Sequence, residues 1–213
     1  TRLTRREHFG PLLVQKPLYP EDAQYCHAII VHPPGGMVGG DQLLIEAVAA
    51  ENTHALLSTP GAAKWYRANG RVAQQRLHLK CEPDSVIEWL PQETIFFNQA
   101  DVSLDSCIDL HGDARYLGCE ILCFGRTASG ERFDQGRLRQ KLSIRVDGKL
   151  LWLEQGTLAG GSAAMHSPLG LAGHSVCATL VCAGRQLSAS VLADVRQHCT
   201  TAAAGAGRFG ATQ

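Results

Sequence analysis

Short runs of apolar residues dominate the chain, and Gly, Pro, Asp or Asn separates each run from the next. Runs of this kind between turn-forming residues are typical of β-strands. In the segment VSLDSCIDL, apolar and polar positions alternate along the strand, which predicts one buried and one exposed face. The pattern therefore predicts a mainly β fold. The predicted strands are residues 43–50, 54–59, 76–81, 85–90, 94–97, 102–110, 115–124, 141–146 and 149–155.

Helical periodicity is found toward the C-terminus, where Val191, Leu192 and Val195 lie at helical spacing. Ser188 precedes them as a possible N-cap, so we expect a helix from Ser188 to Cys199. The glycine-rich stretch 156–174 is predicted to form a long loop or a short helical excursion. Residues 200–213 are low in complexity, and we expect them to be weakly structured.

A weak internal repeat is formed by three nine-residue windows about thirty residues apart. Each window opens with a turn signal and continues through an apolar run. Strands stacked in successive coils of a β-solenoid would produce this pattern, and a β-sandwich with regular hairpins is the alternative. If the windows stack, we expect their ends to gather polar residues at one edge of the molecule. The windows run from Asn52 to Pro60, from Pro83 to Pro91 and from Gly112 to Glu120.

The stretch from Val31 to Gln42, VHPPGGMVGGDQ, combines two prolines, four glycines and one carboxylate between two apolar segments. Such a density of glycine predicts a backbone that bends sharply or closely approaches another segment. Asp41 lies at the start of the strand-like run that follows. Corners of this kind often hold functional sites, although a plain surface turn would give the same pattern.

Composition argues against several classes of function. Twenty Lys and Arg residues balance 20 Asp and Glu residues among 213, so neither a nucleic-acid surface nor an anionic membrane surface is expected. No run approaches the roughly 18 apolar residues of a membrane span. The first residues contain no apolar signal segment, so we expect a cytoplasmic protein. Because the chain does not begin with Met, we expect residues to precede it.

Eight cysteines are distributed along the chain, most of them within apolar runs. Free thiols that pack as small hydrophobic groups explain this distribution better than a disulfide framework. Cys119 and Cys123 have a spacing that places both thiols on one face of a strand and Glu120 on the other. Two such thiols could bind a soft metal ion, but packed thiols are the favoured interpretation.

No familiar catalytic motif is present, because the chain lacks a G-x-S-x-G elbow, a phosphate-binding P-loop and a dinucleotide-binding glycine fingerprint. Four carboxylates nevertheless lie in or beside apolar runs, where an unpaired charge is costly to bury. They either face solvent, pair with a cation such as Lys64, Arg67 or Arg126, or line an internal polar passage. A small hydrolase that uses one of them is the enzyme alternative. These carboxylates are Glu88, Glu93, Glu120 and Glu154.

Five motifs follow one another along the chain: VQKPLYPE (14–21), HPPGGMVGGD (32–41), TPGAAKWYR (59–67), EWLPQETIFF (88–97) and CEILCFGR (119–126). In this order they resemble the urease accessory protein UreD family, which is called UreH in some organisms. The similarity runs from about Arg5 to beyond Glu154, with a looser match in the last third. Agreement of five ordered motifs by chance is implausible.

The resemblance implies a non-enzymatic scaffold that helps to insert nickel into apo-urease. It implies a β-helix-like stack of strands with one or two helices toward the C-terminus. The implied partners are UreF, the GTPase UreG and the urease apoprotein. No cofactor would be tightly bound, because nickel would only pass transiently through a water-filled passage. A purely structural docking module without nickel passage is the alternative.

Residue by residue, the resemblance places Asp41, Glu120 and Glu154 along the nickel passage. Oxygen donors suit transient passage, because they hold nickel more weakly than thiolate or imidazole cages would. The remaining candidates, with a passage-lining or structural role, are Ala63, Lys64, Arg67, Glu88 and Glu93.

Two departures from the family pattern stand out. Many relatives have Ser or Thr where this chain has Ala63, which puts a hydroxyl lining at that point in doubt. Relatives also continue past Gly210 into further strands. We therefore expect residues 1–213 to form a single domain of this family that is truncated at its C-terminus.

Overall fold

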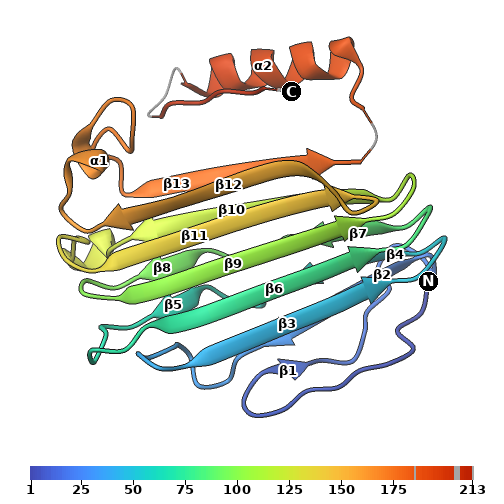
Figure 1. The fold of residues 1–213 in the computed structure, drawn as a ribbon, viewed down its shortest axis with the longest axis horizontal. Coiled ribbons are helices and arrows are strands. Elements are labelled where there is room, and N and C mark those ends of the chain that lie inside the picture. The colour runs from blue at the N-terminus through green and yellow to red at the C-terminus, as the bar shows by residue number, and fades with distance from the viewer. Residues whose placement is uncertain (185, 204–206, 213) are drawn as a thin grey trace.

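Two β-sheets face each other and form the body of the protein in the computed structural model (Figure 1). The structure describes residues 1–184, 186–203 and 207–212. In this part of the chain, the first sheet contains β1 (Leu13–Val14), β2 (Tyr25–Val31), β4 (His54–Ser58), β5 (Ala63–Trp65), β7 (Val86–Trp89), β8 (Thr94–Phe96), β10 (Arg115–Phe124) and β13 (Val176–Ala183). The second contains β3 (Gln42–Ala49), β6 (Ala73–Cys81), β9 (Asp101–Leu110), β11 (Arg137–Val146) and β12 (Lys149–Ala159).

The chain alternates between the two sheets, and successive passes lie parallel to one another. Strands β3, β6, β9 and β11 are parallel neighbours, as are β2, β4, β7 and the first part of β10. A hairpin sandwich would instead place consecutive strands side by side and antiparallel. The predicted mainly β, solenoidal fold is therefore confirmed, with about three turns. Two antiparallel strands, β12 beside β11 and β13 beside β10, end the parallel stack.

The internal repeat corresponds to these stacked passes, but its predicted alignment needs one correction. His54 pairs with Val86, and Val86 pairs with Arg115, so the second and third windows are aligned correctly and the first is one residue out. The error has a local cause: because Leu56 and Leu57 are both apolar, the alternation of apolar and polar residues along β4 is hard to recognise. A one-residue shift moves side chains to the opposite face.

The ends of the windows do not form an edge of the molecule, which corrects a second expectation. Strand β10 is continuous and pairs with β7 through Gly118 and with β8 from Leu122 onward. The break between β7 and β8, which contains Pro91, therefore lies opposite the middle of β10, where Glu120 is found. These residues consequently meet inside a sheet, at an interruption in its strands.

The interior between the sheets consists of two apolar clusters. One contains Leu77, Ile108, Tyr116 and Leu142, and the other contains Leu104, Leu122 and Leu138 with several aromatic rings. Within the second cluster, the Phe96 and Phe124 rings stack with their centroids 5.5 Å apart.

A polar layer separates the two clusters. On each of four strands, an inward-facing polar residue lies between members of different clusters. Polar groups inside a core need hydrogen-bond partners or water, so this layer differs chemically from the apolar packing on either side. Its members are Gln75 on β6, Ser106 on β9, Gln140 on β11 and Glu120 on β10.

The C-terminal region confirms the predicted helix and corrects the predicted loop. Helix α2 (Ala189–Ala203) begins after Ser188, whose Oγ accepts a hydrogen bond from the Val191 N–H at 3.3 Å, as an N-cap does. Strand β12 continues to Ala159, so the first part of the expected loop is extended, and α1 (Ala163–His166) is the short helical excursion.

The remaining helical turn is the 3₁₀ segment η1 (Thr127–Ser129). Helix α2 also extends four residues beyond its predicted end at Cys199. Residues 204–206 and 213, from the stretch predicted to be weakly structured, lie outside the described residues. None of the helices in the described ranges has the length and apolar character of a membrane span.

Candidate functional site

Glu120 and Gln140 meet across the interior, one from each sheet. Glu120 on β10 points between the layers, and Nε2 of Gln140 on β11 donates a hydrogen bond to its carboxylate. Glu154 on β12 lines the same gap, together with Gly118 and Thr179. The gap has a volume of about 10 Å³, which is close to the minimum for one water molecule. Because Glu154 is exposed, the gap reaches solvent beside β12.

Burial makes Glu120 an unusual carboxyl group. Desolvation raises its pKa above the ordinary value, and the charge of Glu154 raises the pKa further. The hydrogen bond from Gln140 acts in the opposite direction, because it stabilises the charged form. A proton or a cation between the two carboxylates would relieve both the burial penalty and the repulsion. The gap is therefore suited to brief occupancy by a positive charge.

Asp41 is placed elsewhere, at the end of the glycine-rich loop. Its Oδ2 accepts a hydrogen bond from the Val38 N–H at 2.9 Å, so the carboxylate closes its own turn. His32 lies nearby: burial lowers its pKa, and the negative charge of Asp41 partly offsets that change. The residues that line the gap do not include Asp41. The structure therefore joins Glu120 and Glu154 but leaves Asp41 as a separate carboxylate.

The glycines of this loop permit close contact with the segment that follows β5. A Cβ on Gly36 would lie 2.5 Å from the Tyr66 ring, and a Cβ on Gly39 would lie 2.6 Å from the Arg71 carbonyl oxygen. The N–H of Met37 donates to the Lys64 carbonyl at 2.8 Å. Both the bend and the close approach predicted from the sequence are therefore present, and they bring two of the five motifs side by side.

The candidates on and after β5 take different positions in this contact. Ala63 is half-buried against the second apolar cluster, and its N–H donates to the Glu93 carbonyl oxygen at 2.8 Å. The Lys64 side chain is exposed, and so is that of Arg67. None of the three lines the gap beside Glu120.

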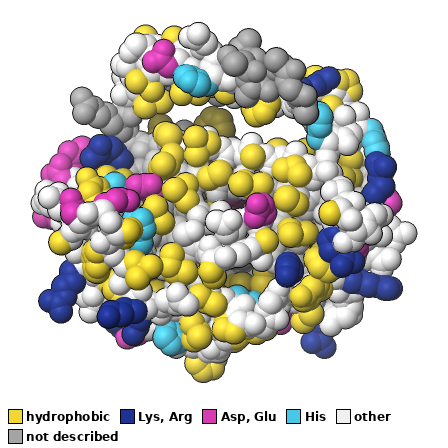
Figure 2. Space-filling model, turned by 180° about the vertical axis from the view of Figure 1, so that it is seen from behind, with side chains coloured by type: hydrophobic (Ala, Val, Ile, Leu, Met, Phe, Trp, Pro, Cys, Tyr) yellow, Lys and Arg dark blue, Asp and Glu magenta, His cyan; other side chains and the backbone are white. Residues whose placement is uncertain are grey.

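Glu88 and Glu93 lie away from the interior, in the first sheet. Oε1 of Glu88 lies 2.5 Å from Nε2 of His54, so its partner is a histidine and not one of the cations predicted from the sequence. Glu93 is exposed at the break between β7 and β8. Arg126, another predicted partner, pairs with Glu131. Figure 2 shows the outer face of this sheet, where apolar side chains gather toward the middle and most charged side chains lie toward the rim.

Sequence reasoning missed several residues of the gap, and Gln140 is the most informative of them. It is the inward polar residue between Leu138 and Leu142. A polar residue in an otherwise apolar strand face is the sequence signal that could have identified it. Thr179 was missed because its strand, β13, was not predicted. A larger hollow of about 380 Å³ beside α1 contains none of the predicted site residues; its lining includes Phe133, Met165, His166 and His174.

The favoured interpretation of packed thiols is confirmed for Cys26 and Cys81, which are buried, whereas Cys182 is exposed and the other five are partly buried. All eight are free, and burial raises the pKa of Cys81 to about 12. Burial also raises the pKa of Cys119 and of Cys123, so both are neutral thiols near pH 7. Among the described residues, the three-ligand group within reach of a metal ion is His78, Cys107 and Asp109 and does not include the predicted Cys119–Cys123 pair.

Comparison with known proteins identifies the family. The family model described as "UreD urease accessory protein" matches residues 1–213. The chain belongs to the UreD family. UreD from Janthinobacterium sp. (strain Marseille) is 61% identical over 213 residues, which are 100% of this chain and 72% of that protein. UreD from Nitrosospira multiformis is 50% identical over 213 residues, again all of this chain and 76% of the relative.

A third relative, UreD from Azoarcus sp. (strain BH72), is 45% identical over 206 residues, which are 97% of this chain and 72% of that protein. The resemblance carried by the five sequence motifs is therefore confirmed for this UreD-family chain.

Proposed function

We propose that this UreD-family chain is a non-catalytic scaffold for nickel insertion into urease. In this proposal it bridges apo-urease and the complex of UreF with the GTPase UreG. Nickel is the cargo and passes through the interior of the solenoid. The proposal gives Glu120 and Glu154 the role of transient oxygen ligands, and it leaves the protein without a catalytic residue.

The observation that carries the proposal is the shared gap of Glu120 and Glu154. A gap that reaches solvent beside Glu154 holds two carboxylates, which provide hard oxygen donors without a thiolate or imidazole that would retain nickel. The polar layer extends this chemistry inward through Gln140 and Ser106. Because apolar clusters lie on both sides of the layer, a hydrated ion would meet its lowest desolvation cost there.

The gap is narrow, with space for about one water molecule. Passage of a hydrated ion therefore requires side chains at the gap to move apart. Glu154 and Thr179 belong to the antiparallel strands that end the stack, and strands at the end of a sheet have fewer packing partners. We place the movement at these two strands.

The decisive experiment measures the nickel content of urease after activation in a reconstituted system with UreF, UreG and each variant. Glu120→Gln keeps the size of the side chain and removes its charge, and we expect at least a severalfold loss of nickel loading. Glu93→Gln makes the same chemical change at an exposed position outside the gap and should load normally. Binding of each variant to the partner complex is measured in parallel.

The second candidate is a docking module that assembles the complex without passing nickel. Half-buried apolar residues on the outer face of β10 favour it, because apolar faces commonly mark protein-protein contacts. Under this alternative, Glu120→Gln would load urease normally, and a charge placed on that outer face would abolish complex formation. Normal loading with Glu120→Gln would therefore reject nickel passage through the gap.

A further inference from the structure

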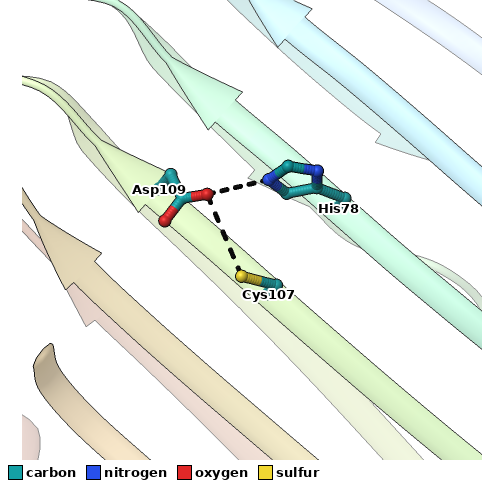
Figure 3. A group of neighbouring side chains, drawn as sticks. All are labelled: His78, Cys107 and Asp109. Atoms are coloured by element: carbon teal, nitrogen blue, oxygen red, sulfur yellow. Dashed lines mark hydrogen bonds and ion pairs between the residues drawn. The ribbon is translucent and has the colours of Figure 1, made fainter. Parts of the chain in front are cut away.

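A second cluster of potential ligands lies on the outer face of the other sheet, away from the gap. Along β9, Cys107 and Asp109 point outward because they alternate with the buried residues Ser106 and Ile108. His78 on the neighbouring strand β6 pairs in register with Cys107. The three side chains therefore converge on one face of adjacent strands, as Figure 3 shows.

The distances between the three groups are short. Nε2 of His78 lies 2.8 Å from Oδ2 of Asp109, and Sγ of Cys107 lies 3.9 Å from the same oxygen. The ligand atoms all lie within 4.8 Å of one another. Cys107 and Asp109 are half-buried and His78 is exposed, so the strands fix two of the groups while the imidazole is free to adjust.

The arrangement does not suit nucleophilic catalysis. A catalytic cysteine needs an imidazole between its thiol and the orienting carboxylate, so that the imidazole accepts the thiol proton. Here the carboxylate of Asp109 is the central group and contacts both the imidazole and the thiol. A mixed nitrogen, sulfur and oxygen donor set fits metal binding better.

We propose that His78, Cys107 and Asp109 bind one divalent transition-metal ion of the zinc and nickel class. Imidazole and thiolate select such ions over magnesium and calcium, which prefer sets of oxygen ligands. Ligand atoms in a tetrahedral zinc site are about 3.5 Å apart. To bring the three ligand atoms of this cluster to that separation, the exposed imidazole of His78 would have to shift by roughly 1 Å. Water completes the coordination, because three protein ligands leave a position open.

Arg145 on β11 modulates this site. Its Nη1 lies 3.3 Å from Sγ of Cys107, so a fixed positive charge faces the position of the ion. Lys80 on β6 also pairs in register with Asp109, but its Nζ forms an ion pair with Oε1 of Glu82 at 2.7 Å. Repulsion by the guanidinium weakens ion binding, and a neutral residue at position 145 should strengthen it. A merely structural role for the cluster would not predict this gain.

Titration of the full chain with Co²⁺, followed by absorbance, tests the site directly. We expect one equivalent of Co²⁺ to produce a thiolate-to-metal charge-transfer band, and Zn²⁺ and Ni²⁺ to compete for the same position. Cys107→Ser should abolish the band, whereas Cys119→Ser, the matched change on the first sheet, should keep it. His78→Gln and Asp109→Asn should weaken binding at least tenfold. Arg145→Gln should tighten binding about thirtyfold, the effect in water of one unit charge on a doubly charged ion about 4 Å away.

Three results would overturn the site: no band with Co²⁺ in large excess, a band that survives Cys107→Ser, or unchanged affinity in Arg145→Gln. Circular dichroism of each variant establishes that it is folded, and His78→Gln changes only an exposed side chain. The site is independent of the proposed passage, since Glu120→Gln should leave the cobalt band unchanged. Failure of one proposal therefore leaves the other standing.

Discussion

Glu120 on β10 and Glu154 on β12 face one gap although they belong to opposite sheets, and the charge of Glu154 raises the pKa of Glu120. Strands β10 and β12 come close only because the last strands of the two sheets lie over each other. In the proposed passage, a cation between the two carboxylates would relieve the repulsion that the fold tolerates at this point.

Removal of the buried charge should stabilise the protein in a pH-dependent way. The folded-state pKa of Glu120 is raised, so the folded state binds more protons than the unfolded state, and stability falls as the pH rises through the raised pKa. Glu120→Gln should therefore be more stable than the parent near pH 7. We expect a rise in Tm of about 2–4 °C, the shift produced by roughly 1 kcal/mol in a chain of this size.

Thermal melts between pH 4 and 8 check this prediction. The advantage of Glu120→Gln should become small at the acid end, where the parent carboxyl group is mostly protonated in both states. Glu46→Gln, an exposed change on β3, provides the control and should alter Tm little at any pH. A Tm of Glu120→Gln below that of the parent at pH 7 would contradict the assigned direction of the pKa shift.

Gln140 and Glu120 should be energetically coupled. Gln140→Leu removes the hydrogen-bond donor and leaves the buried carboxylate unsatisfied, which we expect to cost about 1–3 kcal/mol. The double variant Glu120→Leu with Gln140→Leu removes both partners and should recover much of that loss. Urea unfolding of the parent, the single variants and the double variant gives the coupling energy. Strict additivity would mean that the hydrogen bond does not contribute to stability.

Gly39 in the glycine-rich loop and Gly61, which lies outside it, offer a matched pair of substitutions. A Cβ at Gly39 would meet the Asn69 side chain at 2.4 Å and a backbone carbonyl at 2.6 Å, so Gly39→Ala should cost about 1–3 kcal/mol. A Cβ at Gly61 would meet no atom within 4 Å, so Gly61→Ala should be neutral or stabilising by up to about 1 kcal/mol. Chemical unfolding of both variants tests the close approach, and equal effects would argue against it.

The buried thiols should contribute to stability as apolar groups and not through disulfides. All eight are free, so the addition of a reductant should leave Tm unchanged. Burial raises the pKa of Cys81 to about 12, and we expect this thiol to resist alkylation at pH 8 until the protein is denatured. Mass spectrometry after iodoacetamide treatment, with and without denaturant, measures its modification. Rapid alkylation of native Cys81 would show that the cluster around it opens readily.

Much of the strand content could be predicted, because alternation within a strand is a local property. Strand β9 was found almost to the residue, whereas β1, β2, β5 and β13 were missed. Three residues are too few to show a period in β5. In β13, apolar residues occupy nearly every position, so no face stands out.

The separation of faces could also be predicted, but not which face is buried. The sequence indicated that Glu120 lies opposite Cys119 and Cys123, and the structure adds that Glu120 is the inward residue. The gap required a second piece of information, namely that Gln140 and Glu154 arrive from the other sheet. A sequence pattern does not specify which strands from opposite layers lie over each other.

The sequence by itself determined that the chain is a repetitive β protein, that it resembles the UreD family, and that its glycine-rich loop must bend sharply or approach another segment closely. Only the tertiary structure decided that Glu120 meets Glu154, and that His78 lies beside Cys107. The physical reason is that alternation depends on residues within one strand. Contact between strands depends on register and turn length, which the packing of the whole solenoid sets.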